Sequence, residues 1–276
     1  MPENIAMHDH WFANAPVGDG RLNLVCLPFA GGSSAAFAGW RRKLPAWLNV
    51  CPVVLPGREG RRHELRARDF ASLAGNLADT VITAVDGRNY CLYGHSMGAW
   101  LAHSIAVAGS AAGVPPACLC VGAQHAPHLV YPFPSCDRMS DDNLLEFMQE
   151  FDGVDAQMLA HAEWVRWMLL RVRDDLKLCE THSHEAPYPV LDLPVHAFVG
   201  RSDRLIDPSC IAAWQRHTTY RLDMTLFDGG HFFIRTAEAP FLHELADKLA
   251  RYAGSTSLST QQTDLRPAQA THRATT

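Results

Sequence analysis

Short runs of apolar residues recur along the chain, and longer stretches with helical spacing separate them. We interpret as buried strands the runs at residues 22–27, 50–55, 90–93, 117–122 and 195–199, with a more alternating run at 221–227. Helical spacing predicts helices near residues 35–47, 70–85, 97–112, 208–218 and 240–252. Continuous apolar strands that alternate with helices are typical of a mostly parallel sheet with helices on both faces. The pattern therefore predicts an α/β fold.

One long segment interrupts this alternation. Between Gly122 and Val195, more than seventy residues contain no convincing strand, and helices are expected at 141–151 and around 158–178. The second helix is apolar over more than one face and carries Trp164, Trp167 and Met168. It fits either an ordinary core helix or a helical cap, but an insertion at the carboxyl edge of the sheet is where α/β enzymes place lids. We therefore expect a lid whose Trp164, Trp167 and Met168 cover a pocket.

Composition narrows the class of protein. The chain has 276 residues, of which 47% are hydrophobic and 19% are charged, enough for a sizeable core. We expect one domain over residues 1–253, with the lid insertion at about 135–185 and a disordered, Thr- and Gln-rich tail at 254–276. A net charge of −5 gives no reason to expect nucleic-acid binding. No apolar run reaches 18 residues, no signal-like segment opens the chain, and the eight cysteines form no CxxC pair, so we expect a cytoplasmic protein without membrane contact.

The strongest chemical signal is the sequence Gly-His-Ser-Met-Gly at 94–98. A strand-like run precedes it and a helix-like run follows it, which is the setting of a nucleophile elbow. In such a turn the glycines let strand and helix approach closely, and the Ser96 hydroxyl projects at the edge of the sheet. Ser96 is therefore the predicted nucleophile.

A serine hydroxyl needs a general base, and position selects one among 15 histidines. His231 follows the last strand-like run, after two glycines that allow a tight loop over the sheet edge. His95 is adjacent to the serine, so the two side chains diverge. His125 and His128 follow another strand and could line a pocket, but they lack convincing further ligands for a metal site. We predict His231 as the base.

The base in turn needs an acid that fixes its tautomer. Asp203 comes just after the strand at 195–199. Asp207 precedes a proline and resembles a helix N-cap, and Asp192 lies before the strand, at the wrong edge of the sheet. Asp203 is therefore the favoured acid, and the order Ser96, Asp203, His231 is that of the α/β-hydrolases.

An oxyanion formed at Ser96 needs backbone N–H donors. One is expected from Met97, directly after the nucleophile, and a second from the loop at 28–33, whose glycines let the backbone turn inward. This loop matches neither a dinucleotide-binding nor a P-loop pattern, so a nucleotide site is not expected. Phe29 and Phe232, which flank these elements, complete the candidate substrate-binding residues.

Five motifs together resemble the type II thioesterases, stand-alone α/β-hydrolases that work beside polyketide and nonribosomal peptide synthetases. They are Leu-Pro-Phe-Ala-Gly-Gly at 27–32, Pro-Gly-Arg-Glu at 56–59, the serine motif at 94–98, Gly-Arg-Ser-Asp at 200–203 and Gly-Gly-His-Phe-Phe at 229–233. The resemblance implies a Ser96–His231–Asp203 triad, oxyanion amides at Ala30 and Met97, and a helical lid. Leu55 stands where a polar residue would be expected.

The resemblance also implies the substrate: acyl or aminoacyl groups on the phosphopantetheine arm of acyl or peptidyl carrier proteins. We expect no cofactor, no metal and no nucleic-acid partner, and we expect a monomer. Two other classes remain open. One is a small-molecule esterase, lipase or acyltransferase with the same acyl-enzyme, and the other is a non-catalytic binding protein of hydrolase fold. Five arginines between 58 and 68 are the densest basic cluster, and they form either a solvated loop or a carrier-docking patch.

Overall fold

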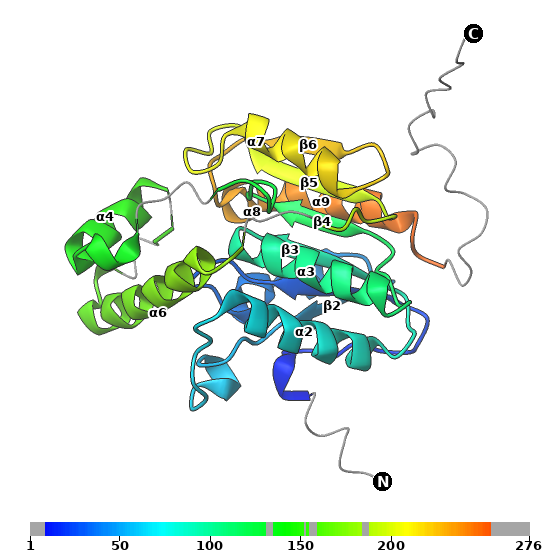
Figure 1. The fold of residues 1–276 in the computed structure, drawn as a ribbon, viewed down its shortest axis with the longest axis horizontal. Coiled ribbons are helices and arrows are strands. Elements are labelled where there is room, and N and C mark those ends of the chain that lie inside the picture. The colour runs from blue at the N-terminus through cyan, green and yellow to red at the C-terminus, as the bar shows by residue number, and fades with distance from the viewer. Residues whose placement is uncertain (1–8, 131–134, 152, 155–158, 184–187, 255–276) are drawn as a thin grey trace, which may run out of the picture.

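The fold is built on a six-stranded parallel sheet in the computed structural model, which describes residues 9–130, 135–151, 153–154, 159–183 and 188–254 (Figure 1). The strand order is β2-β1-β3-β4-β5-β6, and every neighbouring pair is parallel. The strands are β1 (Leu22–Leu27), β2 (Leu48–Pro52), β3 (Tyr90–His95), β4 (Leu119–Gly122), β5 (Val195–Gly200) and β6 (Asp223–Phe227). The predicted mostly parallel sheet is confirmed.

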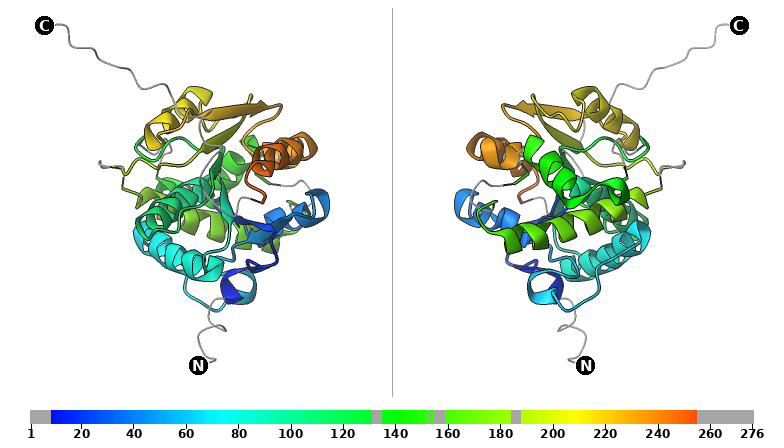
Figure 2. Two further views of the ribbon diagram at one scale, coloured as in Figure 1. Left: turned by 90° about the vertical axis from the view of Figure 1, so that its right-hand side faces the viewer. Right: turned by 90° about the vertical axis from the view of Figure 1, so that its left-hand side faces the viewer.

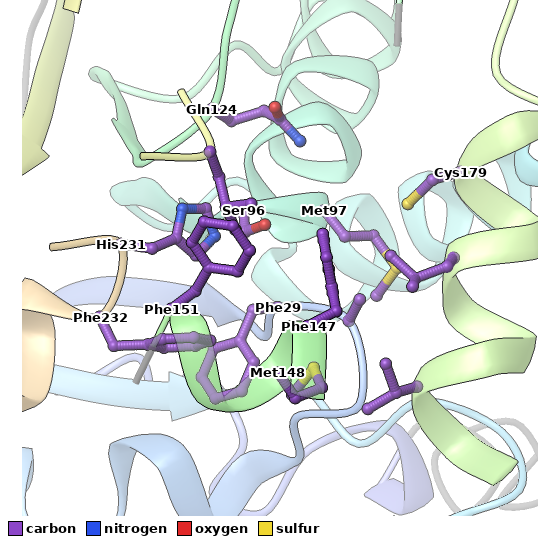
Figure 3. Close-up of a pocket in the computed structure, with 14 residues that line it drawn as sticks. Phe29, Ser96, Met97, Gln124, Phe147, Met148, Phe151, Cys179, His231 and Phe232 are labelled. Carbon is purple, nitrogen blue, oxygen red and sulfur yellow. The ribbon is translucent and has the colours of Figure 1, made fainter. Parts of the chain in front are cut away.

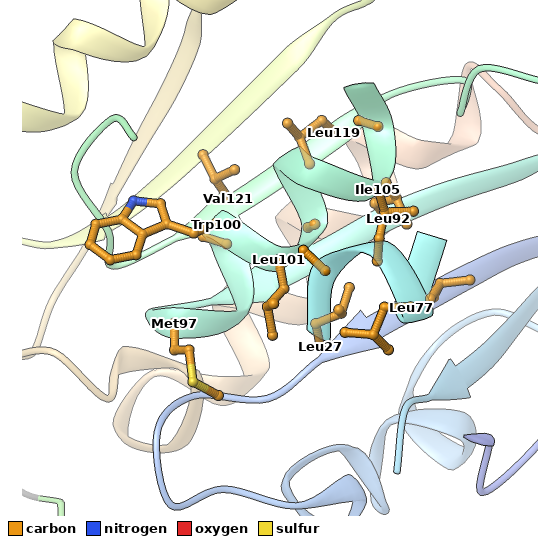
Figure 4. Close-up of a cluster of buried hydrophobic side chains, with 14 of the residues drawn as sticks. Leu27, Leu77, Leu92, Met97, Trp100, Leu101, Ile105, Leu119 and Val121 are labelled. Carbon is orange, nitrogen blue, oxygen red and sulfur yellow. The ribbon is translucent and has the colours of Figure 1, made fainter. Parts of the chain in front are cut away.

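Helices cover both faces of this sheet, as Figure 2 shows in end-on views. One face carries α2 (Phe70–Val85), α3 (Met97–Ala111) and α7 (Pro208–Ala212), and the other carries α1 (Trp40–Lys43), α8 (Phe233–Thr236) and α9 (Glu238–Ala250). Strands β1 to β5 are buried along their whole length, because helices pack on both sides of them. Figure 4 shows part of the larger core, where α2 and α3 pack on the sheet.

Several of the expected elements are divided or bounded differently in the structure, and the helix expected at 208–218 is one of them, since it is α7 followed by a 3-10 turn. The helix expected at 35–47 is instead the 3-10 helix η2 (Ser34–Phe37) and the short helix α1, because Pro45 forces the preceding Leu44 into an extended conformation and ends the helix. The strand expected at 50–55 begins at Leu48 and ends at Pro52. Further 3-10 turns are η1 (Asp9–Trp11), η3 (Glu59–Arg61), η4 (Cys136–Arg138) and η5 (Ala213–His217).

The segment between β4 and β5 forms a separate helical layer at one end of the sheet (Figure 1). Its long helices are α4 (Asp141–Glu150) and α6 (Ala162–Glu180). They pack on each other through a small cluster made by Leu144, Met148, Leu169 and Val172. No helix in the described ranges is long and apolar enough to cross a membrane. The tail at 255–276 lies outside the described residues, so its predicted disorder stays a prediction.

Strand register brings the chemistry-bearing loops to one edge. Leu27 at the end of β1 pairs with Gly94, and Gly94 pairs with Val121 of β4, so the carboxyl ends of β1, β3 and β4 coincide. Gly200 at the end of β5 pairs with Phe227 of β6. The loops that follow these strands therefore meet at the same end of the sheet.

Candidate active site

Ser96 sits on a sharp turn between β3 and α3. Its backbone has φ 53° and ψ −124°, a strained conformation for a residue with a side chain. The flanking glycines explain how this turn is tolerated. A Cβ added at Gly94 would lie 2.0 Å from the Gly98 carbonyl oxygen, and one added at Gly98 would lie 2.2 Å from the Leu27 carbonyl oxygen. Only glycine at both positions allows strand and helix to approach this closely.

His231 and Asp203 are joined by a buried hydrogen bond, with Nδ1 of the imidazole 3.0 Å from Oδ2 of the carboxylate. The other carboxylate oxygen of Asp203 accepts from the N–H groups of Leu205 and Ile206, at 2.9 and 3.1 Å. An ionised carboxylate only accepts, so Nδ1 carries the proton and Nε2 is left as an acceptor. Figure 3 shows the His231 ring beside Ser96 at the pocket wall.

The rival carboxylates lie elsewhere. Asp207 caps α7, accepting from the N–H of Ser209 at 2.7 Å. Hydrogen bonding from the side chain and then the backbone of Ser209 lowers the pKa of Asp207. Asp192 precedes β5 and accepts from the hydroxyl of Thr219 at 2.6 Å. Neither hydrogen bond involves His231, whereas Asp203 binds it directly.

His95 has a role that sequence reasoning did not find. Its fully buried ring lies within hydrogen-bonding distance of the Tyr93 hydroxyl, 3.1 Å from Nδ1, and of the His231 carbonyl, 2.9 Å from Nε2. Burial lowers the pKa of His95 well below its usual value, so the ring is neutral. A neutral imidazole has one donor nitrogen, and donation from Nε2 to the carbonyl holds the loop that carries His231.

The predicted oxyanion donors are the backbone N–H groups of Met97 and Ala30. Met97 is the first residue of α3, so its N–H has no preceding turn of helix to bind it. Ala30 lies in the loop after β1, residues 28–33, called the β1 loop below. Both Ala30 and Met97 line the pocket that contains Ser96. The positions suit a pair of oxyanion donors.

The pocket at Ser96 is mostly apolar (Figure 3). It has about 560 Å³ of empty space, its open mouth included. The predicted Phe29 and Phe232 line it, and they pack edge to face with ring centroids 4.9 Å apart. The described residues that line it are Phe29, Ala30, Ser96, Met97, Gln124, Phe147, Met148, Phe151, Val172, Leu176, Cys179, Leu205, His231 and Phe232.

Three predicted pocket residues lie outside this lining. Trp164 and Trp167 are 60% and 62% exposed, and the half-buried Met168 packs in the cluster between α4 and α6. The pocket contacts α6 from Val172 onward, eight residues or roughly 12 Å along the helix beyond Trp164. The insertion does line the site, but with a different part of its second helix than the tryptophans indicated, and its action as a lid stays a prediction.

The residues that replace them come from both helices of the insertion. Phe147, Met148 and Phe151 of the α4 region and Val172, Leu176 and Cys179 of α6 form one wall of the pocket. The apolar stripe Leu144, Met148, Phe151 was the available signal for α4, since residues four and three apart share a helix face. The tryptophans of α6 were predicted as pocket residues in place of this stripe.

The other residues that the sequence singled out do not have the roles considered for them. His125 packs on Trp100 with ring centroids 5.0 Å apart, and His128 Nδ1 lies 2.8 Å from His217 Nε2, so neither lines the pocket. Within the arginine cluster, Arg58 and Arg61 are buried, which rules them out as surface docking residues.

The parallel sheet, the elbow at Ser96 and the hydrogen-bonded His231 and Asp203 together define an α/β-hydrolase. A family model of the thioesterase domain matches residues 22–251. The chain therefore belongs to the thioesterase family, and it is a thioester hydrolase.

Individual relatives agree with this assignment. Thioesterase PikA5 of Streptomyces venezuelae is 31% identical over 236 residues, 85% of this chain and 83% of that protein. The solved type II thioesterase BorB from the borrelidin biosynthetic cluster is 32% identical, with a TM-score of 0.79 over 87% of this chain and 98% of BorB. YbtT, a type II thioesterase from the Yersiniabactin NRPS/PKS biosynthetic pathway, is 27% identical, with a TM-score of 0.75 over 86% of this chain and 97% of YbtT. The resemblance to type II thioesterases is confirmed.

Proposed function

We propose that this thioesterase hydrolyses acyl groups from the phosphopantetheine arm of carrier proteins, and so clears stalled or wrongly primed synthetases. The observation that carries the proposal is Ser96 beside a carboxylate-bound His231 at the wall of an apolar pocket. The similarity to type II thioesterases such as BorB and YbtT supports the carrier-bound substrate.

The proposed chemistry runs through an acyl-enzyme. Nε2 of His231 takes the proton of the Ser96 hydroxyl as the oxygen attacks the thioester carbonyl. The N–H groups of Ala30 and Met97 stabilise the oxyanion, and Asp203 stabilises the imidazolium. Collapse of this intermediate breaks the C–S bond, and His231 returns the proton to the leaving thiolate of the arm. Water, deprotonated by His231, then attacks the ester at Ser96 and releases the acid.

The pocket lining supports a neutral acyl group over an aminoacyl group. Among the residues of the lining that the structure describes, only Ser96, Gln124 and His231 carry polar oxygen or nitrogen in the side chain, and none is an aspartate or a glutamate. The Oε1 atom of Gln124 already accepts from the His125 N–H at 3.1 Å. An ammonium group would therefore lose its water without gaining a counter-charge, which is strongly unfavourable. We propose apolar acyl groups as the preferred substrates, with α4 and α6 acting as a lid over them.

A matched pair of substrates tests this function. A carrier protein loaded with propionyl differs from one loaded with alanyl only by the α-amino group, and we expect kcat/KM to be at least about tenfold higher for propionyl. Faster turnover of a p-nitrophenyl ester than of the propionyl carrier would favour a small-molecule esterase. Equal turnover of the propionyl and alanyl carriers would contradict the proposed acyl preference.

The roles in the triad are tested separately. Ser96→Ala should lower kcat by about 10³-fold or more, since the hydroxyl is the nucleophile. Asp203→Asn should also be severe, because the amide oxygen would stay on the Leu205 and Ile206 N–H groups and the NH₂ group that then faces His231 cannot accept from Nδ1. The matched variant Asp207→Asn should change kcat by less than about threefold. The reverse order of the two asparagine variants would contradict the assignment of the acid.

A further inference from the structure

Groups outside the sheet hold the β1 loop, which contains Ala30. Within the loop, the Gly32 N–H donates to the Phe29 carbonyl at 2.8 Å. The peptide unit that joins Phe29 to Ala30 is planar, so fixing its carbonyl also fixes the direction of the Ala30 N–H. The next N–H, that of Gly31, donates to Oδ2 of Asp175 at 2.6 Å. The geometry of the loop therefore depends on a side chain of α6.

Arg58 completes this arrangement. Its guanidinium donates to both carboxylate oxygens of Asp175, at 2.6 and 2.8 Å, and through its other terminal nitrogen to the Gly32 carbonyl. Arg58 is 3% exposed and Asp175 is 4% exposed. One ion pair thus holds two peptide groups of the β1 loop, one through the N–H of Gly31 and the other through the carbonyl of Gly32.

A single face of α6 makes both the pocket wall and this anchor. Val172, Asp175, Leu176 and Cys179 follow the spacing of one helix face. Three of them line the pocket, and the fourth binds the loop. Val172 also fills the space beside Gly31, since a Cβ added at that glycine would lie 2.3 Å from its Cγ2 atom. α6 therefore packs directly against the backbone that carries Ala30.

Stability alone does not account for the pair. Removing two charges from water is expensive, and a buried ion pair often stabilises a fold no better than apolar residues of the same volume. Burial raises the pKa of Asp175, and the nearby Arg58 opposes that shift. What the pair does provide is a fixed geometry for the groups around it, because one guanidinium nitrogen binds both carboxylate oxygens and the other binds the Gly32 carbonyl.

We propose that Asp175, held by Arg58, is a positioning residue that sets the Ala30 N–H toward the oxyanion. The oxyanion hole is then complete only while α6 lies against the β1 loop, so that covering the acyl group and assembling the site are one event. This inference rests on the proposed function, in which Ala30 is an oxyanion donor.

The test is Asp175→Asn in the full chain, which keeps the shape of the side chain but turns an NH₂ group or a neutral oxygen toward Arg58. We expect kcat on the propionyl carrier to fall about 10- to 100-fold with KM changed less than about threefold, since loss of one oxyanion donor lowers kcat by roughly 10²–10³. The inhibition constant of a short alkylboronic acid, which forms a tetrahedral adduct on serine, should rise by a similar factor. The dissociation constant of propionyl-amide pantetheine, an unreactive ground-state analogue, should stay the same.

The neighbouring residue provides the matched control. Asp174 pairs with Arg66 near the surface of the same helix. Asp174→Asn should change kcat and the boronic acid inhibition constant by less than about twofold. Equal effects of the two asparagine variants would overturn the inference.

A double variant separates positioning from charge balance and also covers the case in which Asp175→Asn does not fold. Arg58→Met with Asp175→Leu removes both charges, so the fold should be retained. The Gly31 N–H and the Gly32 carbonyl still lose their partners, so we expect kcat to remain at least about tenfold low. Wild-type kcat in this double variant would overturn the inference. A wild-type protein that fails on the propionyl carrier would instead overturn the proposed function.

Discussion

The close approach of α3 to the end of β1 makes Gly98→Ala the most informative single substitution. The added Cβ would lie 2.2 Å from the Leu27 carbonyl oxygen and 2.8 Å from that of Pro28. Ordinary contact begins at 3.4 Å, so the backbones must separate by about 1 Å. No rotamer relieves a clash between a Cβ and backbone atoms. The helix that carries the Met97 N–H and the loop that carries the Ala30 N–H must therefore move apart.

The expected loss of stability in Gly98→Ala follows from this forced movement. Overpacking typically lowers the free energy of unfolding by 1–3 kcal/mol, and we place Gly98→Ala near the upper end, at about 3 kcal/mol, because only backbone can yield. In a domain of this size that corresponds to a Tm lowered by roughly 6–12 °C. Separation of the two N–H groups should also reduce kcat at least about tenfold.

Gly75 in the middle of α2 is the matched control, because a Cβ added there meets nothing within 4 Å. Gly75→Ala should raise the free energy of unfolding by about 0.5–1 kcal/mol through helix propensity and leave kcat unchanged. Thermal unfolding and kcat on the propionyl carrier measure both effects. If Gly98→Ala matched Gly75→Ala in Tm and kcat, the argument from close approach would be refuted.

Two further predictions concern surface charge and pH. Arg62 and Arg68 are exposed and form no ion pair with any other residue described by the structure. Changing both to Glu should therefore lower kcat/KM for carrier substrates about 3- to 10-fold at low salt and less at high salt, with no change on a p-nitrophenyl ester. Equal losses on both substrates would exclude docking, and so would an equal effect of the control double variant Arg41→Glu with Arg42→Glu on α1. Burial lowers the pKa of His103 to about 3, so His103 stays neutral in the folded protein while the unfolded chain takes up a proton below about pH 6.5. The free energy of unfolding should therefore fall as the pH drops from about 6.5 toward 3. His103→Phe should make this fall shallower in urea titrations at pH 7 and pH 5, and an identical fall in the variant would contradict the prediction.

Local chemistry made the sheet and the elbow predictable. The apolar runs predicted the strands, because a strand that is covered on both faces carries apolar residues at nearly every position. The serine motif at 94–98 located the turn, since its glycines are required by contacts with neighbouring backbone. Asp203 and His231 followed from their places after β5 and β6, where parallel strands bring their loops to one edge.

The pocket wall was harder to predict because it depends on tertiary packing. Large aromatic residues in the insertion suggested Trp164 and Trp167, yet the half of α6 that carries them projects beyond the sheet, and both are exposed. The anchor at Asp175 gave no local signal at all. Its partners, Gly31 and Arg58, lie 144 and 117 residues away, and no spacing rule connects them. Burial of a charged residue in an amphipathic helix becomes visible only once the fold is known.

The thiol of Cys179 lines the same pocket as Ser96, so two potential nucleophiles face one acyl group. Thiolates attack esters and thioesters, whereas neutral thiols scarcely do. Burial, reinforced by the negative charge of Asp175, raises the pKa of Cys179 well above its usual value, so the sulfur keeps its proton throughout the neutral range. Transfer of an acyl group to this sulfur, which would leave a dead-end thioester within the wall, is therefore disfavoured, and the proposed route through the Ser96 ester to water is kept free of a competing thiolate.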